Sequence, residues 1–196
     1  FNQSDLRIAA RGIPMVWDRW YRSNRVVPDS KGQWVFDLPV DGPMGYGWHN
    51  TWLCRIEGDS FKTANGLHIN FSKDANGNYL PNSGAGFTLL KTATGYQVLE
   101  NGGFIYNFDA MGKLTSVRDS IGNIATLTYD TDGKLAAIKD TTGRQAFTLT
   151  YNTAGRIATV TDLAGRLVSY DYDNYGNITQ VRHDSNIADT YAYNSS

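Results

Sequence analysis

Residues 129–143 read Tyr-Asp-Thr-Asp-Gly-Lys-Leu-Ala-Ala-Ile-Lys-Asp-Thr-Thr-Gly, and this stretch decides the fold. Its pattern recurs in residues 108–122, 151–165 and 172–186, so that successive units start 21 or 22 residues apart. A fifth unit begins at Tyr193, and in each of the first four a glycine stands four positions after the starting residue. Internal repetition at this period predicts stacked supersecondary units, none of which buries its apolar face alone.

Each unit is predicted to be one antiparallel β-hairpin. The segment that enters each tyrosine alternates apolar and polar residues, as Phe147, Leu149 and Tyr151 do with threonines between them. This alternation is typical of a half-buried strand. Residues 130–133 have turn chemistry, because aspartate accepts local backbone hydrogen bonds and glycine takes positive φ at little steric cost. The chain then returns over residues 135–138 to a second turn at 140–143.

Three details make the hairpin prediction specific. The second turn carries glycine in the first three units and Asn186 in the fourth, where asparagine is expected to take the left-handed conformation. The extra residue of the 22-residue unit lies between Gly143 and Tyr151, where a bulge or a longer turn would absorb it. Leu135 and Ile138 are three positions apart, so either their strand is bulged or both of its faces are partly buried.

The repeat positions are predicted to be structural and not catalytic. Two nearby carboxylates suffice for glycoside hydrolysis, but nearly every aspartate here occupies a turn position, and a catalytic pair has no reason to recur in each unit. The residues predicted to hold the repeat together are Phe108, Gly112, Gly122, Tyr129, Asp130, Gly133, Gly143, Tyr151, Gly155, Gly165, Tyr172, Asp173 and Gly176.

The composition indicates an all-β fold for the whole chain. The 196 residues include 20 glycines, 12 tyrosines and 5 tryptophans, and aromatic residues suit a pleated surface while glycine suits turns. We expect three segments: a Trp-rich start over 1–58, irregular β-hairpins over 59–106, and the repeat array over 107–196, with units starting near 108, 129, 151, 172 and 193. Together they predict an array of antiparallel β-hairpins that forms a curved sheet, an incomplete part of a β-cage.

The charge pattern and the single cysteine exclude several classes of protein. The formal net charge is −1 and no run of lysine or arginine gathers on one segment, so nucleic-acid binding is not expected. Cys54 is the only cysteine, so we expect a buried thiol without an internal disulfide or a structural zinc site. No apolar run approaches the roughly 18 residues of a membrane span, and this segment carries no recognisable signal peptide.

No other motif points to an enzyme or a cofactor. His49, His68 and His183 are scattered along the chain, and no serine or cysteine stands in a Gly-x-Ser-x-Gly context. Residues 130–133 are reminiscent of a calcium loop, but the twelve-residue ligand pattern with its closing glutamate is missing. We therefore predict a protein that is not an enzyme and needs no cofactor or metal.

The tryptophans leave one binding hypothesis open. Arg19 stands close in sequence to Trp17, Trp20 and Tyr21, so these residues are candidates for a cation–π cluster or for a surface that stacks on sugar rings. The alternative is that they form core or an interface. The candidate aromatic binding surface consists of Trp17, Trp20, Trp48 and Trp52.

The repeat resembles the YD repeat of Rhs-family proteins, a group that also includes the shell subunits of insecticidal Tc toxins and the animal teneurins. Tyr129-Asp130, Gly133-Lys134-Leu135 and the Asp140/Gly143 pair carry the match. The upstream part is similar to the opening of an Rhs core, in residues 12–14 (Gly-Ile-Pro), 19–23 (Arg-Trp-Tyr-Arg-Ser) and 45–48 (Gly-Tyr-Gly-Trp). Phe108, Asn152 and His183 depart mildly from the pattern.

The resemblance implies a β-ribbon that spirals into a hollow shell around a C-terminal toxin, as in effectors of type VI secretion and other polymorphic toxins. It implies a secreted or exported protein that acts on competitor or host cells. The expected partners are the rest of the same polypeptide and its toxin. The alternative is a surface-displayed adhesion or carbohydrate-binding module. The Asp-Pro-x-Gly-Leu pattern expected at the family's self-cleavage site is absent, because the chain has no Asp-Pro pair.

A size estimate predicts that this chain does not close a cage. A payload of about 100 residues has a girth on the order of 100 Å, and a surrounding sheet at about 4.8 Å per strand needs roughly twenty strands. The repeat predicts about eight strands and the upstream part about six more. We therefore expect an arc of shell with sheet edges that pair with further sequence, with another chain or with a copy of itself.

Overall fold

The structure is a computed structural model that describes residues 1–22, 25–28, 34–37, 41–80, 84 and 86–193, with the backbone alone described for 25–28 and 34–37. The described residues form nineteen β-strands and no helix. The strands are β1 Asn2–Ile8, β2 Met15–Tyr21, β3 Arg25–Pro28, β4 Trp34–Asp37, β5 Trp48–Asn50, β6 Arg55–Glu57, β7 Ser60–Lys62, β8 His68–Asn70, β9 Phe87–Lys91, β10 Gly95–Glu100, β11 Ile105–Asp109, β12 Leu114–Arg118, β13 Ile124–Tyr129, β14 Leu135–Lys139, β15 Gln145–Tyr151, β16 Ile157–Asp162, β17 Leu167–Tyr172, β18 Ile178–His183 and β19 Asn186–Thr190.

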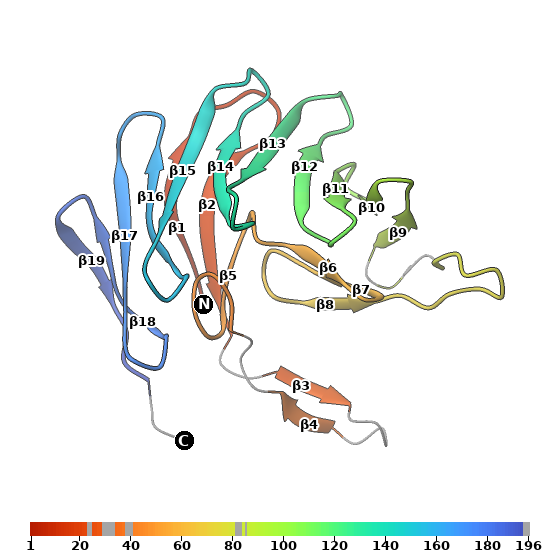
Figure 1. The fold of residues 1–196 in the computed structure, drawn as a ribbon, viewed down its shortest axis with the longest axis horizontal. Helices are drawn as coiled ribbons and strands as arrows, with labels where there is room; N and C mark the ends of the chain where they lie inside the picture. Colours follow the sequence, from red (N-terminus) through yellow and green to blue (C-terminus); the bar gives the residue numbers. More distant parts are fainter. Residues whose placement is uncertain (23–24, 29–33, 38–40, 81–83, 85, 194–196) are drawn as a thin grey trace.

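Strands β9 to β19 form one curved antiparallel sheet of eleven strands (Figure 1). Each strand pairs with the next one along the chain, which confirms the prediction of an array of hairpins. The sheet is open, with β9 and β19 at its two edges. It extends beyond the regular repeat, because β9 and β10 lie upstream of residue 107 and pair with each other and with β11.

A β-bulge in each unit explains the spacing of the aliphatic columns. Thr128 pairs with Ala137 and Tyr129 pairs with Leu135, so Ala136 is an extra residue without a ladder partner. The equivalent shift occurs in the other three units. Because the bulge turns the strand, Leu135 and Ile138 both face the core and expose 3% and 0% of their surface. Of the two alternatives that the sequence left open, the bulge is correct.

A second bulge absorbs the extra residue of the 22-residue unit. Ile138 pairs with Phe147 while Lys139 pairs with Gln145, so Ala146 is the additional residue. It lies within the predicted interval from Gly143 to Tyr151, and it is fully buried, as is Phe147 beside it. The insertion therefore changes the strand locally and leaves the hairpin register after it intact.

The prediction that Asn186 takes the left-handed conformation is wrong. His183 pairs with Asn186, which begins β19, and the turn between β18 and β19 has only two residues. The residue with positive φ is Asp184, at 54°. Its backbone N donates to the Leu167 carbonyl at 2.7 Å and its carboxylate accepts from the Leu167 N at 3.1 Å. These bonds hold Asp184 in a conformation that aspartate tolerates better than most residues.

The N-terminal strands pack against one face of the large sheet. Strands β1, β2 and β5 form a three-stranded sheet, β6 to β8 form another, and β3 pairs with β4. Trp17 of β2 contacts Phe147 edge-on at 5.9 Å between ring centroids, and Phe61 of β7 contacts Phe108 at 5.8 Å. The large sheet curves around these strands, and one hydrophobic core joins them to it (Figure 1). The repeat thus buries its apolar face against the start of the same chain.

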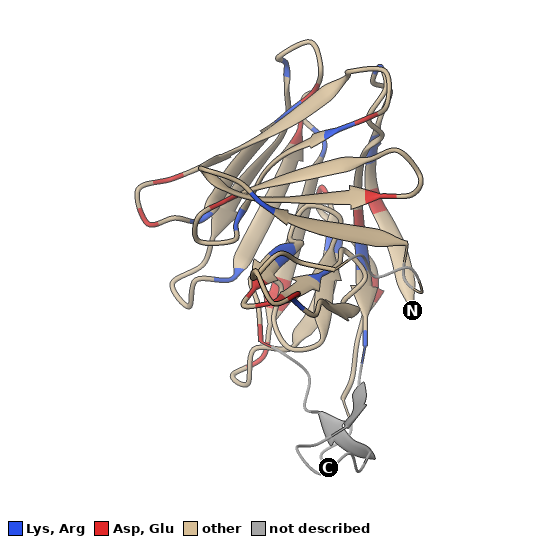
Figure 2. Cartoon of the chain, turned by 90° about the vertical axis from the view of Figure 1, so that its right-hand side faces the viewer, with Lys and Arg blue, Asp and Glu red and all other residues tan. Residues whose placement is uncertain are grey.

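The opposite face of the large sheet is polar and rich in hydroxyl groups. Thr150 and Thr159 lie across β15 and β16 with 2.6 Å between their Oγ1 atoms, and Gln97, Asn107 and Ser116 form a chain of side-chain hydrogen bonds across β10, β11 and β12. One packed and one solvated face is the usual arrangement in antiparallel sheets. Basic and acidic residues are interspersed over the molecule (Figure 2). Among the described residues, no helix is long and apolar enough to cross a membrane.

Candidate functional site

A row of tyrosine hydroxyls joins consecutive hairpins. Tyr129 donates to the carbonyl of Leu114 at 2.7 Å, so a side chain at the end of one hairpin bonds the return strand of the hairpin before it. The same bond recurs in each later unit, from Tyr151 to Leu135 O (2.9 Å), from Tyr172 to Ile157 O (2.7 Å) and from Tyr193 to Ile178 O (2.8 Å). We call these four bonds the tyrosine ladder.

Burial keeps the ladder hydroxyls protonated. Desolvation raises the pKa of Tyr129, Tyr151 and Tyr172, and it raises the pKa of Tyr193 to about 12. Each hydroxyl therefore remains a donor through the physiological range. Phe108 has no hydroxyl and stands at the first position of the column, where its ring is 3% exposed and packs on Phe61. This departure from the repeat pattern costs the ladder one bond and gives the core one more apolar ring.

In each of the first three units, a basic residue lies over the tyrosine of the next unit. Lys113 Nζ is 5.4 Å from the ring centroid of Tyr129, and Lys134 Nζ is 5.5 Å from that of Tyr151. Arg156 repeats the arrangement at 6.0 Å from Tyr172. These distances allow cation–π attraction. Adjacent units are therefore linked by a hydroxyl bond and by a cation over the same ring, a contact that the sequence analysis did not assign.

The substitution Tyr151→Phe is expected to destabilise the protein by about 1 kcal/mol. It removes the tyrosine hydroxyl that donates to Leu135 O, and this bond is partly buried. The matched control is Tyr175→Phe, since the Tyr175 side chain is 80% exposed and is expected to change the free energy of unfolding little. Urea titrations of the two variants measure the difference. Equal midpoints would contradict the stabilising role of the tyrosine ladder.

The repeated aspartates close turns. The carboxylate of Asp130 accepts from the backbone N of Asp132 at 3.0 Å and of Lys134 at 2.8 Å, while its own N donates to the Lys134 carbonyl at 2.9 Å. The same pattern holds at Asp109, Asp119, Asp140, Asp162 and Asp173, and in part at Asn152. The seven glycines of these turns have φ between 74° and 91°. The aspartates thus carry the local hydrogen bonding that the sequence analysis expected of them.

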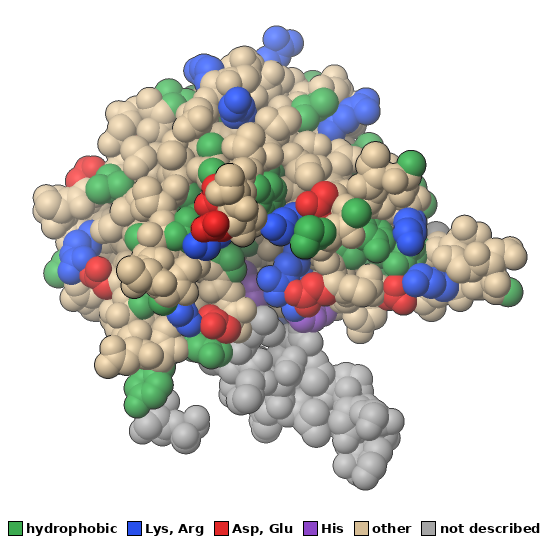
Figure 3. Space-filling view, viewed as in Figure 1, with side chains coloured by type: hydrophobic (Ala, Val, Ile, Leu, Met, Phe, Trp, Pro, Cys, Tyr) green, Lys and Arg blue, Asp and Glu red, His purple; other side chains and the backbone are tan. Residues whose placement is uncertain are grey.

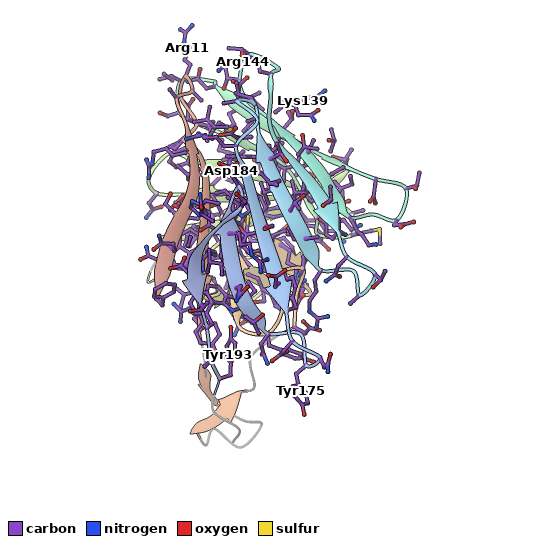
Figure 4. The ribbon with its side chains drawn as sticks, turned by 90° about the vertical axis from the view of Figure 1, so that its left-hand side faces the viewer. Arg11, Lys139, Arg144, Tyr175, Asp184 and Tyr193 are labelled. Atoms are coloured by element: carbon purple, nitrogen blue, oxygen red, sulfur yellow. The ribbon has the colours of Figure 1, made fainter. Side chains whose placement is uncertain are left out.

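A segment of the N-terminal region runs along one row of turns. Residues 41–56, which we call the edge strap, follow the turns at 109–112, 130–133, 152–155 and 173–176. The backbone N of Ile56 donates to Gly112 O at 2.9 Å, and that of Ile157 donates to Pro43 O at 2.7 Å. In Figure 4 this row of turns lies at the lower end of the strands, where Tyr175 and Tyr193 are labelled. Lys139 and Arg144 are labelled at the opposite end. The strap ties the start of the chain to several repeat units at once.

The strap approaches the turn at 173–176 so closely that position 45 of the strap must be glycine. Gly45 has φ 83°, and a Cβ at this position would overlap the carbonyl oxygen of Gly176. This contact explains why the Gly-Tyr-Gly-Trp element at 45–48 starts with glycine, which has no Cβ and tolerates this conformation. The upstream element and the repeat are therefore parts of one packing arrangement.

A buried ionic cluster joins the N-terminal sheet to the last strands of the large sheet. Arg19 of β2 is fully buried and pairs with Asp5 of β1 at 2.7 Å and with Asp189 of β19 at 2.5 Å. Tyr170 of β17 donates to Asp5 at 2.6 Å, and Tyr191 accepts from Arg19. Burial alone would lower the pKa of Arg19, but Asp5 and these hydrogen bonds raise it above its ordinary value. The guanidinium is thus permanently charged and fully partnered.

The cation–π prediction for Arg19 identified the right residue and the wrong aromatic partners. The guanidinium lies over the rings of Trp48, at 5.2 Å, and Tyr191, at 5.4 Å, and not over Trp17, Trp20 or Tyr21. Only Trp20 is adjacent to Arg19 and points to the opposite face of β2. Trp17 and Tyr21 lie two positions away on the same side, but Trp17 packs on Phe147 and Tyr21 packs on Trp48 and Tyr193.

The predicted aromatic binding surface does not exist in this structure. Trp17, Trp48 and Trp52 are 0%, 3% and 2% exposed and belong to the hydrophobic core, and Trp20 is half-buried. The indole of Trp17 donates to Tyr170, and that of Trp52 donates to Val16 O at 2.8 Å. A sugar ring needs an open aromatic face, so Trp17, Trp48 and Trp52 are core, the alternative named above. The side chain of Trp34, the fifth tryptophan, lies outside the described residues.

The structure brings together two of the three histidines. His49 and His68 line a small cavity of about 40 Å³ together with Arg55 and Lys62. Burial, followed by the nearby positive charges of Arg22, His68, Arg55 and Lys62, lowers the pKa of His49 to about 4. Cys54 is buried, as expected, and burial raises the pKa of its thiol to about 12. No group of three metal-ligating side chains occurs among the described residues.

Stability is expected to fall as the pH decreases from about 6.5 to about 4. In this window the unfolded chain protonates His49 while the folded chain keeps it neutral, so unfolding takes up a proton and acid favours it. The expected loss is about 2 kcal/mol after allowance for partial exposure. Urea titrations at pH 7 and pH 4.5 measure it, with His49→Gln as the test variant. A wild type and a His49→Gln protein with identical pH dependence would contradict the assignment.

A known protein family matches slightly more than half of this chain in sequence. The family model described as the teneurin YD-shell matches residues 96–196. Among proteins of curated function, none matches this chain in sequence. Solved structures similar to this chain include a TcdB2–TccC3–Cdc42 complex, at 13% identity over 93% of this chain, and the Tc holotoxin pore of Photorhabdus luminescens, at 14% over 93%. The TM-scores are 0.21 and 0.22, and this chain spans 15% and 14% of the length of those chains.

Proposed function

The chain belongs to the teneurin YD-shell family, and on that premise we propose that it is a wall segment of a shell that encloses a polypeptide. In this proposal the shell encloses or guides a C-terminal toxic polypeptide and is exported, by type VI secretion or another route, toward competitor or host cells. The partners are then the remainder of the same polypeptide and its toxin.

The observation that carries the proposal is the open repeat itself. From the hairpin of β11 and β12 onward, each hairpin is joined to the next by the same ladder bond, and further units after Tyr193 would extend this row. Eleven strands at about 4.8 Å span roughly 50 Å, about half the girth needed around a payload of about 100 residues. Both edge strands offer unpaired backbone groups, which favour pairing with further strands or self-association.

The same proposal assigns a different structural role to each of the three segments of the chain. The Trp-rich start at 1–58 and the hairpins at 59–106 fill the inner face of the wall segment, and the repeat at 107–196 supplies the extendable sheet. The alternative of a carbohydrate-binding module loses its support, because the tryptophans proposed to stack on sugar are mostly buried.

Limited proteolysis of the complete gene product tests the enclosure. We expect the polypeptide downstream of residue 196 to resist a protease concentration that degrades the same polypeptide expressed alone. The double variant Tyr151→Ala/Tyr172→Ala should open the wall and expose it, whereas Tyr175→Ala should not. Cleavage at the same rate with and without the shell would overturn the proposal, and strong binding on a glycan array would favour the alternative.

A further inference from the structure

A cavity of about 240 Å³ lies between the edge strap and the turn at 130–133. Its floor is apolar and includes Trp52, Cys54 and Leu135, and its wall includes the ladder residues Tyr129 and Tyr151. Three basic residues line it, Arg55, Lys113 and Lys134, and none of its described lining residues is acidic. Figure 3 shows basic, acidic and hydrophobic side chains side by side near the centre of this face. The cavity therefore favours an occupant with negative charge and apolar surface.

The cavity lies at the one turn of the row that the strap does not contact through its backbone. Ile56 reaches the turn at 109–112, Pro43 reaches the strand that follows the turn at 152–155, and Gly45 lies against the turn at 173–176. Among the described residues, no strap backbone hydrogen bond reaches the turn at 130–133. The repeat thus has four similar turns along this edge, and the strap contacts three of them. We call each of these turns, together with the residue that follows it, a station, and we call the one at 130–133 the open station.

The neighbouring station, at the turn 152–155, shows which side chains of the strap bind beside the basic residue Arg156. Arg156 lies between two tyrosine rings, Tyr172 of the ladder and Tyr46 of the strap, each 6.0 Å from the guanidinium carbon. It also bonds the carboxylate of Asp41 at 3.0 and 3.1 Å. The strap therefore supplies one carboxylate and one aromatic ring, five residues apart in sequence, to this basic residue.

Lys134 holds the equivalent position at the open station without these partners. It covers Tyr151 as Arg156 covers Tyr172. Among the described residues its one ion-pair partner is Asp132, at 3.7 Å, and the Asp132 side chain is 72% exposed. The other two basic residues are engaged, since Lys113 donates to Gly133 O at 2.7 Å and Arg55 pairs with Glu57. The charge that an incoming anion would meet is chiefly that of Lys134.

We propose that this cavity is a docking site for an extended peptide that carries a carboxylate and an aromatic ring a few residues apart. The carboxylate pairs with Lys134, and the ring packs against the aliphatic part of that side chain and on the apolar floor, as Asp41 and Tyr46 do at Arg156. The occupant belongs to a polypeptide segment other than the strap. This site goes beyond the role of the repeat as a wall.

Titration calorimetry with the capped peptide acetyl-Asp-Gly-Pro-Met-Gly-Tyr-amide, the sequence of residues 41–46, tests the proposal on the 196-residue chain and on the complete gene product. We expect one saturable site per chain. The substitution Lys134→Glu should weaken binding about tenfold, because it removes both the ion pair and the cation over Tyr151. The control Lys139→Glu makes the same charge change at the other end of β14 and should leave binding unchanged (Figure 4).

Peptide variants identify which group is recognised. Replacing the peptide aspartate with asparagine, or its tyrosine with alanine, should each weaken binding several-fold. If Lys134→Glu does not fold by circular dichroism, Lys134→Gln replaces it, and weaker binding is again expected. Absence of binding, or equal affinity in the Lys134 and Lys139 variants, would overturn the proposal. Equal affinity for 4-hydroxyphenylacetate and for the peptide would also overturn it, because the site would then be one for small aromatic acids. These outcomes do not depend on whether the shell encloses a toxin.

Discussion

Replacing Gly112 with alanine is expected to destabilise the protein by about 3 kcal/mol or more, and replacing Gly143 with alanine by only about 1 kcal/mol. Both glycines have φ 81°, so the backbone strain introduced by alanine is the same at the two positions. At Gly112, however, an added Cβ would overlap the carbonyl oxygen of Ile56, and at Gly143 nothing lies within 4 Å. The difference between the two variants therefore isolates the close approach of the chain at Ile56.

The cost at Gly112 is large because the obstacle is backbone. The overlap pushes β6 away, which breaks the bond from Ile56 N to Gly112 O and loosens the strap where it meets the repeat. A side chain could rotate away from a new Cβ, but the Ile56 carbonyl belongs to a strand paired with β7. Urea denaturation of both variants measures the effect. Equal losses of stability would show that the strap does not depend on this contact.

Replacing Arg19 with methionine is expected to cost about 3–5 kcal/mol, because it leaves the buried carboxylate of Asp5 without its countercharge. Asp5 would keep the hydrogen bond from Tyr170, but a buried carboxylate with one neutral donor is poorly compensated. Asp189 also loses its partner, so the edge strand β19 should become less protected from hydrogen exchange.

The control for this prediction is Arg144→Met. Arg144 pairs with Asp140 at 2.6 Å, but its side chain is 52% exposed, and the Asp140 carboxylate keeps its bonds to Thr142 and to the backbone. A loss of about 1 kcal/mol or less is expected there. The double variant Arg19→Met/Asp5→Leu should recover much of the stability lost in Arg19→Met, since it removes the unpaired charge. A single variant at Arg19 as stable as that at Arg144 would show that the buried cluster contributes little.

The hairpins could be predicted from sequence because their causes are local. Asp130 and Gly133 specify a turn within four residues, and the alternation before Tyr151 specifies which face of its strand is buried. Counting the repeat alone placed the inserted residue between Gly143 and Tyr151, the interval in which the structure has the extra residue Ala146. In these places the nearest neighbours in sequence decide the conformation.

The contacts between units could not be predicted in the same way. The tyrosine ladder joins strands of different hairpins, and the strap bonds Gly112 and Ile157 from residues far upstream, so nothing local indicates either. The prediction for Asn186 failed because the turn closed two residues early, at Asp184. One signal was present in the sequence: a basic residue, such as Lys134, follows the turn glycine in three consecutive units, and its position over the next tyrosine recurs with the repeat.

We propose that the eleven-stranded sheet is one arc of a wall that further strands extend. Cryo-electron microscopy of the complete gene product tests it most directly. We expect β9 or β19 to pair with an antiparallel strand from outside residues 1–196, and the ladder bonds of Tyr129, Tyr151, Tyr172 and Tyr193 to be retained. Bare edges at both β9 and β19, or edges covered by helices, would contradict it.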